Sequence, residues 1–179
     1  GTIARLDVGH RWRSPGIHAQ SAFAIDADPT GALVVSAGAD GMLRLWDAPT
    51  GEQGHRWKAH QTWVTKVIWT PAGIWSAGAD GRLKRWSVAG KLEVDLDAGE
   101  KAITALMIQA DTIITGSEIG EVCVFDTRSG KQLWQQTVQG TVMSLTGLAG
   151  AVYVGQADGV VSIWDMTNGR SRGTLRGDR

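Results

Sequence analysis

A segment of about 40 residues recurs along the chain, and this repeat constrains the fold more than any other feature of the sequence. Its four clearest copies are, in chain order, SAGADGMLRLWD (36–47), SAGADGRLKRWS (76–87), TGSEIGEVCVFD (115–126) and VGQADGVVSIWD (154–165). An aromatic residue near the end of each copy recurs at intervals of 40, 39 and 39 residues, at Trp46, Trp86, Phe125 and Trp164. The chain is therefore built from copies of one supersecondary unit.

Each copy has the pattern of short antiparallel strands. Residues 33–39 and 42–47 are rich in apolar residues and are joined by Asp40-Gly41, a dipeptide that adopts the positive φ angles of a tight hairpin turn. Another short apolar strand precedes this hairpin, and a glycine-containing turn leads from it into a fourth strand. Four strands in about 40 residues are typical of the blade of an all-β propeller.

The repeat predicts about four and a half four-stranded antiparallel blades from a ring of seven or eight. Gly1–Asp7 aligns on Gly41–Asp47, so the chain is expected to begin with the outer strands of a preceding blade. Nothing after Asp165 supplies the inner strands of that blade, so we expect the parent chain or a partner to supply the remaining blades. The expected units are outer strands at 1–16 and blades at 17–58, 59–98, 99–138 and 139–179.

These repeats resemble the WD-repeat family, whose pattern is a His-containing turn, a Ser or Thr strand, an Asp-containing turn and Trp-Asp. In that family, these four residues form a buried hydrogen-bonded tetrad within a blade. Such a network is physically sound because a buried Trp N–H needs a hydrogen-bond acceptor. The Ser hydroxyl accepts from the Trp and donates to the His, and the Asp carboxylate accepts from the other side of the His ring. The resemblance implies two full tetrads, at His18, Ser36, Asp40 and Trp46 and at His60, Ser76, Asp80 and Trp86.

The last two copies depart from this pattern. The third has Ile119 and Phe125 at the Asp and Trp positions, the fourth has Val154 at the Ser position, and neither has the His. Replacing every partner of a polar network by apolar groups can be nearly neutral for stability. Asp126–Trp134 also resembles the docking motif of quinoprotein-type propellers, which implies a Trp packed between neighbouring blades.

No group of residues has the arrangement of an active site. Ser, His and Asp recur once per blade together with Trp, which favours a structural network over a hydrolytic triad. No His, Cys and Asp cluster has the spacing of a metal site, and no phosphate-binding loop is present. We predict no enzyme activity, catalytic residue, metal or cofactor. The alternative is a quinoprotein-like enzyme with its active site in the central channel.

The charge balance disfavours two classes of partner. Eighteen basic and eighteen acidic residues cancel, which leaves no electrostatic case for a nucleic acid or an anionic membrane. The single Cys123 excludes an internal disulfide and fits a reducing compartment. No apolar stretch approaches the ~18 residues of a membrane helix. We expect an intracellular protein of the cytoplasm, with the nucleus as the open alternative.

The leading interpretation is a scaffold that binds other proteins within a multi-protein assembly, through the top face and the edges of its blades. In the WD-repeat geometry, residues at the start of each inner strand reach this top face around the central channel. The resemblance therefore implies a partner-binding surface at Phe23, Trp63, Thr65, Glu118 and Met143. For Trp63 the alternative is that its ring fills the space between two blades.

Overall fold

The computed structural model describes residues 18–176, in which all sixteen regular elements are β-strands. Their bounds are β1 (Ala22–Ala27), β2 (Leu33–Gly38), β3 (Met42–Asp47), β4 (Gln53–Lys58), β5 (Val64–Thr70), β6 (Gly73–Gly78), β7 (Arg82–Trp86), β8 (Leu92–Asp97), β9 (Ile103–Gln109), β10 (Thr112–Ser117), β11 (Glu121–Asp126), β12 (Gln132–Thr137), β13 (Val142–Leu148), β14 (Ala151–Gln156), β15 (Val161–Asp165) and β16 (Ser171–Leu175).

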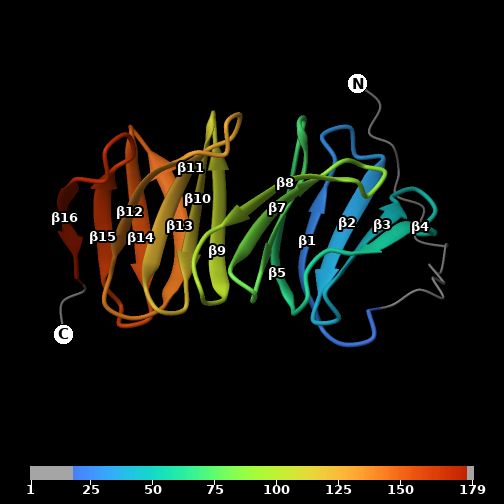
Figure 1. Ribbon diagram of the computed structural model, residues 1–179, viewed down its shortest axis with the longest axis horizontal. Helices are drawn as coiled ribbons and strands as arrows, with labels where there is room; N and C mark the ends of the chain where they lie inside the picture. Colours follow the sequence, from blue (N-terminus) through green and yellow to red (C-terminus); the bar gives the residue numbers. More distant parts are fainter. Residues whose placement is uncertain (1–17, 177–179) are drawn as a thin grey trace, which may run out of the picture.

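The strands form four antiparallel sheets of four consecutive strands each, which we number blades 1 to 4 along the chain. The blades follow one another in a row from β1–β4 to β13–β16, and the inner strands β1, β5, β9 and β13 lie next to each other (Figure 1). The prediction of an all-β propeller with four-stranded blades is confirmed. Each sheet falls within one expected blade range, whereas the outer strands expected at residues 1–16 lie outside the described residues.

Glycine allows the tight hairpin between the second and third strands of each blade. Gly81 has a φ of 71°, and a Cβ at this position would overlap the carbonyl oxygen of Gly99. The same turn in blade 1 contains Gly41, with a φ of 72°. Only glycine combines this backbone conformation with such a close approach of another backbone, which explains the recurrent glycine of the repeat.

Apolar side chains fill the space between successive blades. Leu43 and Leu45 of β3 share one buried cluster with Val64, Ile74 and Trp86 of blade 2. Corresponding clusters lie between blades 2 and 3 and between blades 3 and 4. Blades 2 and 3 therefore each bury one face against the blade before and the other against the blade after, which fixes the stacking order of the four described blades.

Candidate functional site

Blade 2 contains a hydrogen-bonded network of four side chains. The indole Nε1 of Trp86 donates to Oγ of Ser76 at 2.9 Å, and Oγ of Ser76 lies 2.8 Å from Nε2 of His60. On the other side of the ring, Nδ1 of His60 lies 2.8 Å from Oδ1 of Asp80. This geometry assigns the ring proton to Nδ1, so that the serine hydroxyl donates to Nε2 and the carboxylate accepts from the imidazole.

The Asp80 carboxylate is held in its ionised form by this network. Burial alone would raise its pKa, but the hydrogen bond from His60 lowers the pKa below its ordinary value. The backbone N–H groups of Arg82 and Gln61 also donate to this carboxylate. Ser76 is 0% exposed, so its hydroxyl is out of reach of a substrate, as expected for a structural network.

Blade 1 brings the corresponding four residues together and adds a fifth. Both nitrogens of His18 lie 2.8 Å from their partners, Asp40 and Ser36, and Nε1 of Trp46 donates to Ser36 at 2.8 Å. The fifth residue, Arg44, is not indicated by the repeat pattern, and its buried guanidinium donates to Asp40 at 2.8 Å. Burial opposes these contacts, but the hydrogen bonds, first that of His18, lower the pKa of Asp40 to about 2.

Blades 3 and 4 lack the histidine and are held in this region by other contacts. In blade 3, Phe125 lies buried in the apolar cluster with Cys123, and burial raises the pKa of that thiol to about 12. In blade 4, Nε2 of Gln156 donates to Oγ of Ser162 at 2.9 Å, and both side chains are buried. Apolar packing and a short amide contact thus replace the four-residue network there.

The top face is the end of the blades where the inner strands begin and the second hairpins turn. Irregular register places an extra residue in each inner strand, including Phe23 in β1 and Thr65 in β5. Such bulges redirect side chains and are common beside binding sites. A cavity of about 530 Å³ opens here between blades 1, 2 and 3, lined by Phe23, Trp63, Thr65, Lys66, Ala79, Ala102, Thr104 and Glu118.

Two aromatic rings form the apolar part of this top-face cavity. Trp63 is 53% exposed and Phe23 is 45% exposed, and their ring centroids are 5.7 Å apart. Of the expected surface, the structure brings Phe23, Trp63, Thr65 and Glu118 around one cavity. Met143 is exposed in blade 4 but does not line it.

Hydrogen bonds between neighbouring blades lie beside the top-face cavity. Oγ1 of Thr65 donates to the carbonyl of Ile103 in blade 3 at 2.5 Å, and Oγ1 of Thr104 donates to Val142 in blade 4 at 2.5 Å. The hydroxyl protons of these threonines are therefore engaged within the fold and are not free for a ligand. These hydrogen bonds join the inner strands of neighbouring blades beside the top-face cavity.

The described part of the chain has neither a candidate metal cluster nor a helix that could span a membrane. Among residues 18–176, no group of three or more His, Cys, Asp or Glu side chains has an arrangement that could hold a metal ion. Over the same residues, no helix has the length and apolar character needed to cross a membrane.

Two family models match the chain. Residues 39–172 match the model described as outer membrane protein assembly factor BamB. Residues 13–47 match the WD domain, G-beta repeat. Together the two models extend over all four described blades, and the matches agree with the two resemblances noted in the sequence.

Individual relatives are similar over most of this chain. It is 28% identical to Pre-mRNA-processing factor 19 of Caenorhabditis elegans, over 86% of this chain and 34% of that protein. It is 29% identical to eukaryotic translation initiation factor 3 subunit I of Pyricularia oryzae, over 65% of this chain and 39% of that protein. The chain spans between 21% and 40% of the length of these and the other curated relatives.

Solved structures of designed β-propeller proteins have the same fold. The computationally designed Ika4 protein superposes with a TM-score of 0.79 at 28% identity, over 88% of this chain and 99% of that chain. The designed Ika8 protein superposes with a TM-score of 0.81 at 29% identity, over 92% of this chain and 52% of that chain.

Proposed function

Because this chain belongs to the family described as outer membrane protein assembly factor BamB, whose model matches residues 39–172, and also matches the WD domain, G-beta repeat over residues 13–47, we propose that it is a scaffold that binds other proteins through its top face. The observation that carries the proposal is the exposed pair Phe23 and Trp63 at the top-face cavity. Other tryptophans of the described chain, such as Trp75 and Trp86, are buried between blades. Packing therefore accounts for them but leaves Trp63 unexplained.

The physical argument concerns how protein interfaces obtain their affinity. A few large side chains in well-framed pockets supply most of the binding free energy, and aromatic residues are enriched among them. Phe23 and Trp63 are such side chains, with Lys66 and Glu118 as opposite charges on the rim. We propose that these four residues and Thr65 contact the partner, and that Met143 extends the surface along blade 4.

The relatives support the general class of function. Their names include a pre-mRNA-processing factor and a subunit of a translation initiation factor, and a subunit is by definition a component of a larger assembly. We propose that this chain likewise works inside the cell as part of a multi-protein assembly. The balanced charge favours protein partners over nucleic acid or membrane.

The enzymatic alternative has less support. The Trp of the quinoprotein-type motif, Trp134, donates its Nε1–H to the carbonyl of Met166 at 2.9 Å and packs edge-on against Trp164. It therefore lies between blades 3 and 4 as a packing residue. The hydroxyl of Ser76 is buried, which argues against its use as a nucleophile.

Blades 1 and 4 both have exposed apolar side chains. A cavity of about 560 Å³ on blade 1 is lined by Ile25, Val34 and Trp46 among others, and Ile25 is exposed. Leu148 is exposed in blade 4. We propose that further blades, from the parent chain or from a partner, cover these end sheets and complete a ring of seven or eight.

The test of the top-face proposal compares three variants by quantitative affinity capture. Trp63→Ala and Phe23→Ala should each lower partner recovery about tenfold or more while the melting temperature stays close to that of the unchanged protein. Leu92→Ala, at an exposed apolar position on the outer strand β8, is the matched control and should retain every partner. If all three variants capture the same partners equally, or if Trp63→Ala unfolds the protein, the proposal fails.

A further inference from the structure

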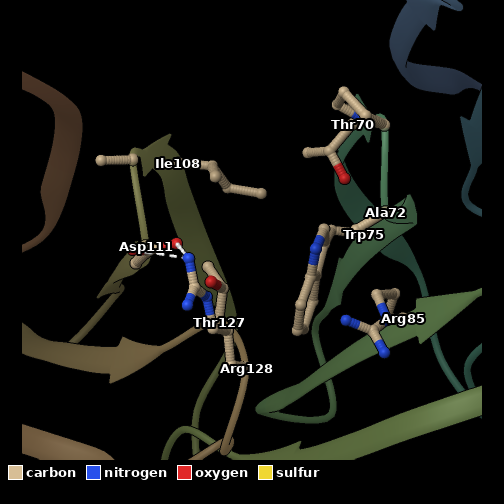
Figure 2. A pocket seen from close by; sticks show the side chains of 10 residues that line it. Thr70, Ala72, Trp75, Arg85, Ile108, Asp111, Thr127 and Arg128 are labelled. Carbon is tan, nitrogen blue, oxygen red and sulfur yellow. Dashed lines mark hydrogen bonds and ion pairs between the residues drawn. The ribbon is translucent and has the colours of Figure 1, made fainter.

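A third cavity, of about 340 Å³, opens between blades 2 and 3 at the end of the blades opposite the top face (Figure 2). Three hairpin turns surround it: β5–β6 with Pro71, β9–β10 with Asp111, and β11–β12 with Arg128. Figure 2 shows the indole of Trp75 on one side of this bottom cavity and Ile108 and Arg128 on the other. The cavity therefore has apolar walls and a cation at its rim.

The residues beneath the bottom cavity depart from the repeat. Trp75 of β6 pairs with Arg85 of β7. At the same register, blade 1 pairs Val35 with Leu45, blade 3 pairs Ile114 with Val124, and blade 4 pairs Tyr153 with Ile163. The other blades have uncharged residues at both of these positions, so packing between blades does not require the Trp–Arg pair.

Arg85 places a partly buried positive charge under this cavity. Its guanidinium lies over the indole of Trp75, 5.6 Å from the ring centroid. Its Nε is buried and forms an ion pair with Oε2 of Glu93 at 3.3 Å, without the geometry of a hydrogen bond. Glu93 therefore balances the charge of Arg85, and the guanidinium supports the indole of Trp75 as one wall of the cavity.

Arg128 provides a second cation, on a turn that is already ordered. Oδ1 of Asp126 accepts from the backbone N–H of Ser129 at 2.7 Å and from that of Arg128 at 3.2 Å. The Arg128 side chain is 79% exposed, and its contact with Asp111, at 3.1 Å, is a surface ion pair. Such pairs are weak, so the guanidinium can exchange Asp111 for an incoming carboxylate at little cost.

We propose that the bottom cavity binds a peptide segment of another protein in which an apolar side chain is followed by a carboxylate. The apolar side chain of the peptide lies against Pro71, Ala72 and Ile108, and the cavity has room for one large side chain. The carboxylate binds the Arg128 guanidinium, which matches the two oxygens of such a group in a bidentate geometry. This site is separate from the top-face cavity, so the two proposals stand or fall independently.

The test uses N-acetyl-phenylalanine as the probe and N-acetyl-phenylalaninamide as its uncharged counterpart, followed through the backbone amide signals of the ¹⁵N-labelled protein. The acid should shift the signals of Ala72, Ala110 and Thr127 saturably in the millimolar range, and the amide should bind about tenfold more weakly. N-acetyl-phenylalanyl-aspartyl-amide carries its carboxylate on a side chain, so it distinguishes an internal acidic residue from a chain terminus. Tighter binding of either acidic probe than of the uncharged amide supports recognition of an apolar group followed by a carboxylate.

Three variants make the test specific. Arg128→Gln should weaken the acid about tenfold without affecting the amide, and Ala72→Phe, which fills the cavity from an exposed position, should abolish binding of both. Arg56→Gln, at an exposed arginine on β4, should bind like the unchanged protein. Retained amide dispersion shows that each variant is folded. Equal binding of acid and amide, shifts outside this cavity, or unchanged binding by Ala72→Phe overturns the proposal.

Discussion

Gly78 lies directly against the imidazole of His60, so closely that a Cβ on the glycine would overlap the ring at Nδ1. Gly38 has the same relationship to His18 in blade 1. Where the histidine is absent, a side chain occupies the glycine position instead. Ser117 accepts from the backbone N–H of Glu121 at 3.0 Å in blade 3, and Gln156 donates to Ser162 in blade 4. In the described blades the histidine therefore occurs together with the glycine, because a side chain at the glycine position would overlap the imidazole.

Substitution of Gly78 by alanine should destabilise blade 2. The added methyl group displaces His60 and breaks its hydrogen bonds to Asp80 and Ser76, with an expected loss of about 1–3 kcal/mol in the free energy of unfolding. Gly54→Ala is the control, because a Cβ there meets only the carbonyl oxygen of Leu45, at 3.8 Å. Urea denaturation of both variants measures the difference. Equal stability would contradict the close-contact argument.

Substitution of Asp80 by alanine should also destabilise the protein, by about 1–3 kcal/mol, because His60 and two backbone N–H groups lose their acceptor. Ile119 occupies the equivalent position in blade 3 and is exposed, so Ile119→Val should cost less than about 0.5 kcal/mol. Thermal unfolding checks the ranking. An Asp80→Ala variant that melts like the unchanged protein would show that the network is dispensable.

The lowered pKa of Asp40 predicts acid sensitivity. The pKa of about 2 in the folded protein lies below the ordinary aspartate pKa of 3.8, so folding favours the ionised form. The resulting stabilisation is complete above pH 3.8 and is lost as the pH falls towards 2. The stability of Asp40→Asn should therefore fall less over this interval. Chemical denaturation at several pH values between these limits measures both curves, and parallel curves would contradict the assignment.

The buried thiol of Cys123 should be unreactive in the folded protein. Burial raises its pKa to about 12, so only a negligible fraction is thiolate at pH 8. A colorimetric disulfide reagent should release almost no colour under native conditions and one equivalent after denaturation. Rapid labelling of the native protein would show that the junction between blades 2 and 3 opens easily.

The exposed end sheet should promote self-association of the isolated 179-residue chain. Ile25→Thr removes an exposed apolar group from the cavity on blade 1 and should lower the apparent mass at high protein concentration. Light scattering after size exclusion provides the measurement, with Leu133→Thr on the outer strand β12 as the control. A monodisperse monomer at all concentrations would contradict the need for covering blades.

The sequence by itself determined the blades. The 39–40-residue period, the alternation of short apolar runs and the Asp-Gly turns are local signals, and each of the four described sheets repeats them. The tetrad of His60, Ser76, Asp80 and Trp86 follows from the resemblance of these repeats to the WD-repeat pattern, whose residue types are present in the sequence. These features depend on strand register within one repeat, which nearby residues set.

Only the tertiary structure decided what lies between repeats. The bond from Thr65 to Ile103, the added contact of Arg44 with Asp40, and the cavity between Trp75 and Arg128 are invisible in the repeat pattern. The alignment of repeats treats equivalent positions as identical, whereas the distance between a turn of one blade and a strand of the next depends on how the two sheets stack. That stacking follows from the packing of all the buried side chains together.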